Sequence, residues 1–354
     1  MEFHRAGTSW TCDPAVQRAA SETWTRSGNA SFNRYVFAHL WPQMAETKAE
    51  HLLAAWTRKR PDLVIAECSD LGAHLAARIL DLPLVAADNG LGPVLLDLWD
   101  TDVAPALAPL YKQYEQAPPT LPPMLTPAPV PWFYGTFPSG MRTVPRTLAE
   151  HRTAGVPAGT GRSLSGRPLV YVSLGTLTTA MPGLRTVVEG LYGEILAALS
   201  GIDCEVTVSA GALAERLRNA HPRVTVAEHV PQPALLRRAD LFVTHGGRAS
   251  LLDAVQGATP VLAMGVLADQ PYNAAAFARR GLGRSLGLSA TRHEIAEGLT
   301  DVLGSPRYRT AMTAAGEELS RLPPFDLVEL WNSVRLSDHN DVPRAPETPV
   351  NPYE

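Results

Sequence analysis

Short apolar runs alternate with one-sided amphipathic stretches along the C-terminal half of the chain. Residues 169–173 (LVYVS) form an apolar run, and residues 184–199 then place apolar side chains at spacings of 3, 4 and 7, the period of a helix packed on one face. The alternation continues, with strands expected at 205–209, 223–227, 241–244 and 260–264, and helices at 212–219, 234–238, 249–256, 272–280, 292–303, 306–321 and 325–334. This pattern predicts a doubly wound domain around a parallel sheet.

The N-terminal half has the same α/β character. Helices are expected at 14–24 and, with an interruption at Pro42, at 32–58. A strand, an amphipathic helix and a second strand are then expected at 63–67 (LVIAE), 71–80 and 82–88. Apolar strands on either side of a helix predict a βαβ unit with buried parallel strands.

Two regions without a helix or strand pattern interrupt the chain, one at residues 118–131 and one in the linker expected at 151–167. Between residues 118 and 131, seven of fourteen positions are proline, which predicts a loop or an extended wall and neither a helix nor a central strand.

At 354 residues the chain exceeds the length at which a single core usually divides. We expect one domain at 1–150, a linker at 151–167, a second domain at 168–336 and a poorly ordered polar tail at 337–354.

Composition and charge exclude several classes of protein. The chain is 45% hydrophobic and 19% charged, as in ordinary globular proteins, and its net charge of −4 argues against a nucleic-acid-binding surface. No apolar run approaches the roughly 20 residues of a transmembrane helix and the N-terminus lacks a signal-peptide core, so we expect a cytoplasmic protein. The chain has three cysteines, which lie far apart, and no two histidines at HxxxH spacing. The sequence therefore predicts neither a disulfide framework nor a metal site.

The stretch 240–257 (DLFVTHGGRASLLDAVQG) carries the clearest chemistry. It reads as a strand, a turn of His245, Gly246 and Gly247, and a helix. A helix N-terminus offers unpaired backbone N–H groups and about half a positive charge, and the glycines let a phosphate approach the backbone. With the His245 ring and the Ser250 hydroxyl, this segment is suited to hold a diphosphate. The alternative is structural: a buried histidine and a serine that caps its helix.

Polar side chains follow several strands expected in the second domain. Ligands of open α/β sheets bind beyond the carboxyl ends of the strands, so the loops there would share one rim if the strands are neighbours. These loops and the following helix carry Thr176, Gln232, Asp253 and Asp269. A hydroxyl, an amide and two carboxylates beside a diphosphate suit a nucleotide sugar. Two structural alternatives stay open, because Gln232 precedes a proline as a turn residue would, and Asp269 could cap the helix that Pro271 begins.

The ordered set SLGT, HVPQ, HGGRASLLD and DQ resembles the C-terminal domain of family-1 glycosyltransferases of the GT-B fold, especially the bacterial antibiotic and macrolide glycosyltransferases. The resemblance is strong over residues 168–285. The steps of five from His245 to Ser250, eight from His245 to Asp253 and sixteen from Asp253 to Asp269 match that family. It implies an α/β architecture with two Rossmann-like doubly wound domains.

The same resemblance implies a role for each donor-site residue. The backbone of Val230 and the side chain of Gln232 would face the base, and Asp253 the ribose. Asp269 with Gln270 would bind the sugar hydroxyls, and the diphosphate would be held by Thr176, His245, Gly246, Gly247 and Ser250. Two departures bear on the ribose contact and on the choice of nucleotide: Asp253 stands where the family usually has Glu, and Arg248 with Ala249 replaces the more usual residues before the serine.

The first domain is similar to the family less completely. Family members carry their general base, a histidine oriented by a carboxylate, in the loop after the first strand. The N-terminus MEFHRAGTSW resembles the family's third strand and the segment after that strand, so by this resemblance the N-terminal domain is incomplete and His4 is not at the position of the base. Glu67 matches the orienting carboxylate and is the candidate catalytic residue. We expect the natural protein to begin upstream or to be a degenerate relative.

The resemblance implies an inverting glycosyltransferase that moves a hexose or deoxyhexose from a UDP- or dTDP-sugar to a hydroxyl of an apolar natural product. No cofactor or metal is expected, because the helix N-terminus and its side chains would neutralise the departing diphosphate. The acceptor would lie in the first domain, against Trp99, Trp132 and Phe133, and a homodimer is a candidate assembly. The alternative is a nucleotide-sugar-binding pseudoenzyme or helper subunit without a base, and a third interpretation is an epimerase acting on the nucleotide sugar itself.

Overall fold

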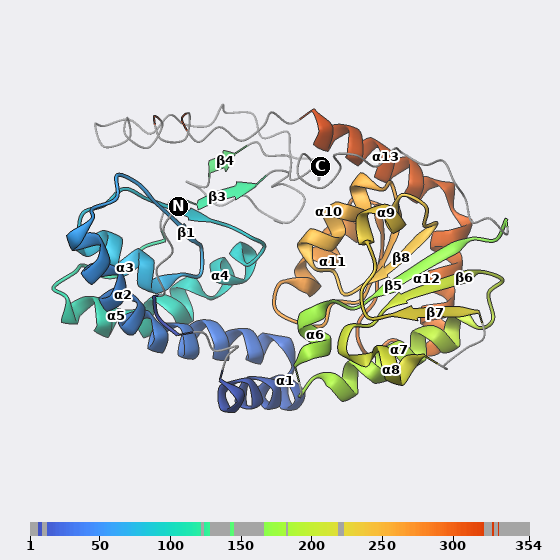
Figure 1. Ribbon diagram of the computed structural model, residues 1–354, viewed down its shortest axis with the longest axis horizontal. Coiled ribbons are helices and arrows are strands. Elements are labelled where there is room, and N and C mark those ends of the chain that lie inside the picture. The colour runs from blue at the N-terminus through green and yellow to red at the C-terminus, as the bar shows by residue number, and fades with distance from the viewer. Residues whose placement is uncertain are drawn as a thin grey trace.

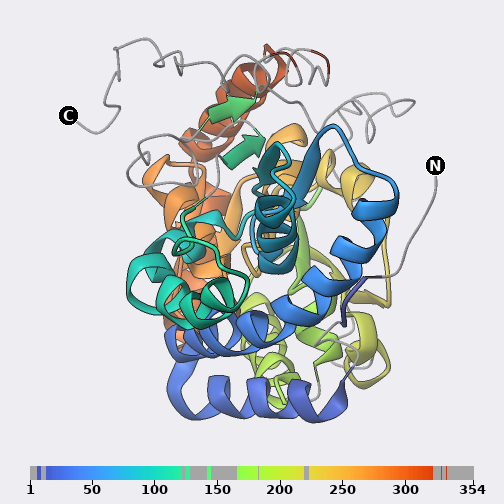
Figure 2. The ribbon, with the colours of Figure 1, turned by 90° about the vertical axis from the view of Figure 1, so that its left-hand side faces the viewer.

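The chain forms two α/β lobes that lie side by side, each built on its own parallel sheet (Figure 1). The computed structural model describes residues 6–8, 13–121, 124–127, 142–144, 166–181, 183–218 and 223–321, and positions 328 and 332. Figure 2 looks onto the first lobe and shows its N-terminal helices along the lower side.

The second lobe is built on six parallel strands in the order β10-β9-β8-β5-β6-β7. Their bounds are β5 (Leu169–Ser173), β6 (Glu205–Ser209), β7 (Val224–Ala227), β8 (Leu241–Thr244), β9 (Val261–Ala263) and β10 (Gly283–Ser285). Every residue of β5, β8 and β9 is buried, as expected of central strands covered on both faces. The first five strands were predicted to within one residue at each end, whereas β10 (GRS) has no apolar run to mark it.

Helices cover both faces of this sheet. They are α6 (Thr176–Ala180), α7 (Arg185–Leu199), α8 (Ala214–Leu217), α9 (Gln232–Leu236), α10 (Arg248–Gln256), α11 (Gln270–Arg279), α12 (Arg292–Gly304) and α13 (Pro306–Ser320). α7 and α12 pack together on one face, where Ile195 and Leu299 are fully buried, and α9, α10 and α13 pack on the other around Leu251 and Met312. Apart from the short α6, each of these helices was predicted to within two residues at each end, and α7 was marked by apolar positions that recur at the helical period.

The first lobe consists of α1 (Pro14–Tyr35), α2 (Trp41–Arg58), β1 (Val64–Glu67), α3 (Leu71–Ile79), β2 (Leu84–Ala87), α4 (Gly92–Leu98), α5 (Ala104–Gln113), β3 (Met124–Pro127) and β4 (Arg142–Val144). Single π-helical turns, Val36–Leu40 and Trp99–Val103, join α1 to α2 and α4 to α5. The expected break at Pro42 is where α2 begins, because proline is tolerated in the first turn of a helix. The predicted βαβ unit is confirmed as β1, α3 and β2, which pair in parallel.

The proline-rich stretch corrects one expectation. We predicted no central strand between residues 118 and 131, but β3 lies between β2 and β4 in the four-stranded sheet β1-β2-β3-β4. The prolines flank the strand or end it, so Leu125 and Thr126 keep the backbone N–H groups that a central strand needs.

Several other expectations fall on residues outside the described ranges. These are the linker up to residue 165, the tail 337–354, most of the helix expected at 325–334, and the side chains of His4, Trp132 and Phe133. The domain limits 1–150 and 168–336 therefore stay predictions. Of the helices in the described part of the chain, none is both long and apolar enough to cross a membrane.

Candidate functional site

The carboxyl ends of β5, β8 and β9 form one rim that faces the first lobe (Figure 1). The strand register sets Ser173 beside Thr244 and Thr244 beside Ala263, so the loops after these strands start at the same level. The loop after β7, two strands further along the sheet, opens at the same edge. The expectation that these loops share a rim is confirmed.

The ring of His245 lies between two glycines of this rim. A Cβ placed on Gly175 would lie 2.6 Å from the His245 Nε2 atom, and one placed on Gly247 would lie 2.5 Å from it. Gly175 also has a φ of 84°, a conformation that L side chains rarely adopt. The two loops therefore confine the ring from both sides.

The ring of His245 is neutral at pH 7. Desolvation on burial lowers its pKa to about 4, although a hydrogen bond with the Ser173 backbone raises it in part. A neutral imidazole has one N–H donor and one acceptor nitrogen. The neutral His245 ring can therefore donate only one hydrogen bond, and donation to a phosphate would replace the bond that the ring makes with the Ser173 backbone.

Replacing Gly247 with alanine is expected to displace this ring. Gly247 has a φ of −62°, which alanine adopts readily, so the backbone should hold while the new Cβ collides with Nε2. We expect affinity for a nucleotide sugar to fall about tenfold, about 1.4 kcal/mol, by calorimetry. The control is Gly190→Ala on α7, where a Cβ meets no atom within 4 Å. Unchanged affinity in Gly247→Ala would show that the ring has no part in binding.

The N-terminus of α10 is the centre of the predicted anion site. Its N-cap residue is Gly247, and no side chain in the described part of the chain caps it, so the suggestion that Ser250 serves as the cap is wrong. The Ser250 hydroxyl instead accepts a hydrogen bond from the Gln232 amide at 3.3 Å. Gly246 packs against α11, since a Cβ there would lie 2.8 Å from the Gln270 carbonyl oxygen. Of the predicted diphosphate ligands, Thr176 is exposed at the start of α6.

Gln232, the first residue of α9 after the loop that follows β7, links this loop to α10 and β5. Its Nε2 donates to Asp253 Oδ2 at 2.9 Å as well as to Ser250, and its Oε1 accepts from the Tyr171 hydroxyl at 3.2 Å. Asp253 is only 3% exposed, and Val230 lies partly buried in the loop just before Gln232. The side chain is therefore more than a turn residue, because it joins the residues expected to hold the ribose and the diphosphate.

The loop after β9 carries Asp269 and Gln270. Asp269 is the N-cap residue of α11, but its carboxylate makes no capping bond and accepts instead from the Asn273 side chain at 2.6 Å. Burial raises the pKa of Asp269 to about 6, against the lowering effects of Asn273 and Arg248. The Gln270 Oε1 accepts from the backbone N–H groups of Val266 and Leu267 at 3.1 and 2.8 Å, which closes the loop.

The first lobe contributes carboxylates at the ends of β1 and β2. Glu67 Oε2 accepts from the Ser69 backbone at 2.9 Å and from the Ser69 hydroxyl, and Oε1 accepts from Cys68 Sγ at 3.1 Å. Burial raises the pKa of Glu67, which these bonds lower in part. Asp88, the first residue after β2, is buried and forms an ion pair with Arg248 of the second lobe at 2.9 Å.

Sequence reasoning missed this ion pair. It treated Arg248 only as a departure from the family pattern and Asp88 only as the end of a strand. The two residues are 160 positions apart, so no local pattern could join them. An arginine at the start of an otherwise buried helix was the one available signal, because a buried guanidinium requires a partner.

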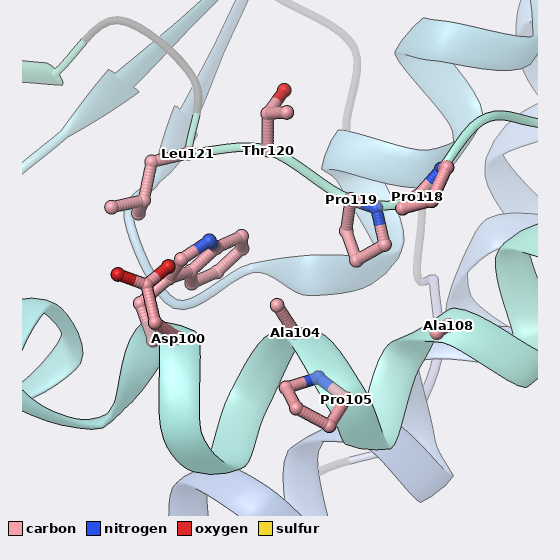
Figure 3. Close-up of a pocket in the computed structure, with 9 residues that line it drawn as sticks. Asp100, Ala104, Pro105, Ala108, Pro118, Pro119, Thr120 and Leu121 are labelled. Atoms are coloured by element: carbon pink, nitrogen blue, oxygen red, sulfur yellow. The ribbon is translucent and has the colours of Figure 1, made fainter.

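A cavity of about 500 Å³ lies in the first lobe. It is lined by Trp99, Asp100, Ala104, Pro105, Ala108, Pro118, Pro119, Thr120 and Leu121, and Figure 3 shows the 118–121 segment passing over the helix of Asp100 and Pro105. Three residues before Asp100, Asp97 accepts a hydrogen bond at 2.8 Å from the Tyr272 hydroxyl of the second lobe. The cavity is therefore close to the boundary between the lobes, and it brings Trp99 beside the first prolines of the proline-rich stretch.

The amino-acid sequence is similar to those of known glycosyltransferases. The chain is 32% identical over 169 residues to the zeaxanthin glucosyltransferase of Pseudescherichia vulneris, a match that covers 46% of this chain and 39% of that enzyme. The chain thus spans about two fifths of the length of this relative. It is 28% identical over 275 residues to the elloramycin glycosyltransferase of Streptomyces olivaceus, covering 76% of this chain and 68% of the relative.

Solved structures agree on the fold. The spinosyn rhamnosyltransferase in complex with spinosyn aglycone superposes with a TM-score of 0.67 at 18% identity, over 92% of this chain and 83% of that one. The same enzyme with thymidine diphosphate gives 0.64 at 16% identity, over 94% and 85%. Residues 193–332 match the model of the erythromycin biosynthesis protein CIII-like C-terminal domain. The chain is therefore similar to that family over these residues, and it has the GT-B fold of the glycosyltransferase structures, with two Rossmann-like α/β lobes.

Proposed function

We propose that this protein transfers a hexose or deoxyhexose from a UDP- or dTDP-sugar to a hydroxyl of an apolar natural product, with inversion at the anomeric carbon. The observation that carries the proposal is the neutral His245 ring, held between two glycines at the N-terminus of α10. On this proposal the His245 ring, the helix N–H groups and Ser250 would stabilise the negative charge that develops on a departing diphosphate. No metal ion or other cofactor is then needed for that step.

The remaining rim residues suit the other parts of the donor. We infer that the linked side chains of Gln232 and Asp253 contact the nucleoside, and that Asp269 with Gln270 contacts the sugar hydroxyls. The cavity beside Trp99 and the prolines offers apolar surface for an acceptor. The printed names of the relatives support the same classes of ligand: one is a glucosyltransferase for zeaxanthin, and another was solved with thymidine diphosphate and with an aglycone.

A second candidate is a nucleotide-sugar-binding helper without transferase activity. It is favoured by the surroundings of Glu67, whose two carboxylate oxygens accept hydrogen bonds from the adjacent Cys68 and Ser69. A carboxylate held in this way by its own turn is less free to orient a base or to accept a proton from the acceptor.

A transfer assay separates the candidates. The protein is incubated with a UDP-sugar or a dTDP-sugar and a panel of hydroxylated polycyclic and macrolide acceptors, with and without a chelator, and products are identified by mass spectrometry. We expect a glycoside of inverted anomeric configuration by NMR, in equal yield with the chelator. Nucleotide binding in calorimetry without any glycoside would favour the helper, epimerised donor in the absence of acceptor would indicate an epimerase, and no nucleotide binding would contradict the proposal.

A further inference from the structure

Arg248 occupies an unusual place between the two lobes. It is the first residue of α10, directly after the Gly247 N-cap, and its side chain is only 6% exposed. Its Nη1 donates to Asp88 Oδ2 at 2.9 Å, and the Asp88 side chain is fully buried. The end of α10 proposed to hold the leaving diphosphate is therefore joined by a buried ion pair to the first lobe.

Asp88 organises the turn that faces the donor rim. Its Oδ1 accepts from the backbone N–H groups of Gly90 and Gly92 at 2.7 and 2.9 Å, and this fixes the turn that leads into α4. One carboxylate oxygen thus shapes the turn and the other binds Arg248. Any movement of Arg248 relative to Asp88 would be passed to the start of α4.

This turn lies against Asp269 as well as against Arg248. A Cβ on Gly90 would come within 2.9 Å of Asp269 Oδ2 and 3.3 Å of Arg248 Cδ. Gly90 has a φ of 127°, so the turn depends on glycine both for its backbone conformation and for this close approach. The Asp269 carboxylate, proposed to bind sugar hydroxyls, is therefore at the surface between the lobes.

The loop that carries Asp269 is also held from its other side. Trp24 Nε1 of α1 donates to the Val266 carbonyl at 2.8 Å, and the Asn29 and Asn33 side chains donate to the Ala268 carbonyl at 2.9 and 3.3 Å. Ala268 has a φ of 52°, a left-handed conformation that these contacts help to maintain. Both α1 and the Asp88 turn of the first lobe therefore contact this loop.

We propose that Arg248 is a positioning residue that aligns the acceptor-side turn of the first lobe with the donor rim of the second. The inference rests on the proposed sugar transfer. By holding Asp88 from the start of α10, Arg248 sets the distance between the leaving-group helix, the Asp269 carboxylate and the ends of β1 and β2. Nucleotide binding uses groups of the second lobe alone and does not need this pair, whereas transfer requires both lobes in register.

The test compares Arg248→Met, Asp88→Asn and the double variant with the wild-type protein. Asparagine keeps the side-chain oxygen that accepts from Gly90 and Gly92, and it replaces the charged oxygen that accepts from Arg248 with an NH2 group. We expect kcat for transfer to fall about 30-fold in each single variant, with the Kd for UDP or dTDP within threefold of the wild-type value. The double variant should be no slower than the slower single variant, because both substitutions break one interaction.

Tyr272→Phe is the matched control. It removes an exposed hydrogen bond between the lobes, to Asp97, and leaves the Arg248–Asp88 pair intact, and we expect kcat within twofold of wild type. If a single variant with one unpaired buried charge fails to fold, the double variant, in which both charges are gone, provides the measurement. Wild-type kcat in the folded variants, or a loss of nucleotide affinity that accounts for the loss of rate, would overturn the inference.

Amide hydrogen exchange tests whether Arg248 aligns the two lobes, and it does so without a measurement of turnover. The amides of Gly90 and Gly92 should exchange at least tenfold faster in Arg248→Met than in the wild-type protein, and at the wild-type rate in Tyr272→Phe. If the wild-type chain binds nucleotide but glycosylates no acceptor, the proposed transfer fails while the exchange rates still test the role of Arg248. Unchanged exchange at both glycines would overturn that role.

Discussion

Replacing His245 with alanine is expected to lower kcat/KM for sugar transfer by about 10²- to 10³-fold, or about 3–4 kcal/mol. The ring is confined between Gly175 and Gly247, so its position changes little when the donor binds, and the ring N–H needs only to exchange the Ser173 backbone for the diphosphate as its partner. Alanine removes this donor and leaves a space that water would fill. The effect should be measured with a saturating acceptor and a varied nucleotide sugar.

The pH dependence of this effect gives a second check on His245. Its pKa is lowered to about 4, so the ring is neutral throughout the range from pH 6 to 8 and its contribution should be constant there. The matched control is His293→Ala, an exposed histidine on α12, which should leave kcat/KM unchanged. If His245→Ala lost activity only below pH 6, the ring would be acting as a cation, contrary to its buried position.

Replacing Asp269 with asparagine is expected to stabilise the protein at neutral pH by about 3 kcal/mol. Burial raises the pKa of Asp269 from the ordinary value of 3.8 to about 6, so the folded protein binds this proton more tightly than the unfolded chain. The stabilising contribution of the protonated form is therefore complete below about pH 4 and is lost as the pH rises through about 6. Asparagine is neutral at every pH and avoids this loss.

Urea denaturation from pH 4 to pH 8 measures the Asp269 effect directly. The free energy of unfolding of Asp269→Asn should equal that of the wild-type protein near pH 4 and exceed it above pH 7, while affinity for the sugar portion of the donor falls. Asp203→Asn, at an exposed carboxylate, should change stability by less than about 0.5 kcal/mol at any pH. A difference between Asp269→Asn and wild type that does not vary with pH would contradict the raised pKa.

The gain in stability expected at Asp269 fits its position. A carboxylate enclosed between two lobes is costly to keep ionised, and α1 and the Asp88 turn hold its loop in place despite that cost. Such groups recur at functional sites, where binding a ligand requires a charge that the fold alone would avoid. Sugar hydroxyls that donate to the Asp269 carboxylate would supply the hydrogen bonds that water does not provide in the closed interface.

The amino-acid sequence alone determined most of the second lobe and the residues of its candidate site. Strands such as Leu241–Thr244 are continuous apolar runs, helices such as α7 repeat their apolar positions at the helical period, and glycines mark the turn between β8 and α10. These signals are local, so they could be recognised residue by residue. Three short strands were missed, because prolines surround β3 and neither β4 (RTV) nor β10 (GRS) has an apolar run.

Only the tertiary structure decided how the parts of the site act on one another. The confinement of His245 depends on β5 lying beside β8, the bonds of Gln232 depend on the loop after β7 reaching α10, and the Arg248–Asp88 pair depends on the packing of two lobes. Each contact joins residues distant along the chain, and which side chains meet is set by strand order and lobe packing. The sequence therefore determined that a glycine turn leads into the N-terminus of a helix, and the fold decided that this helix also forms a buried ion pair with the first lobe.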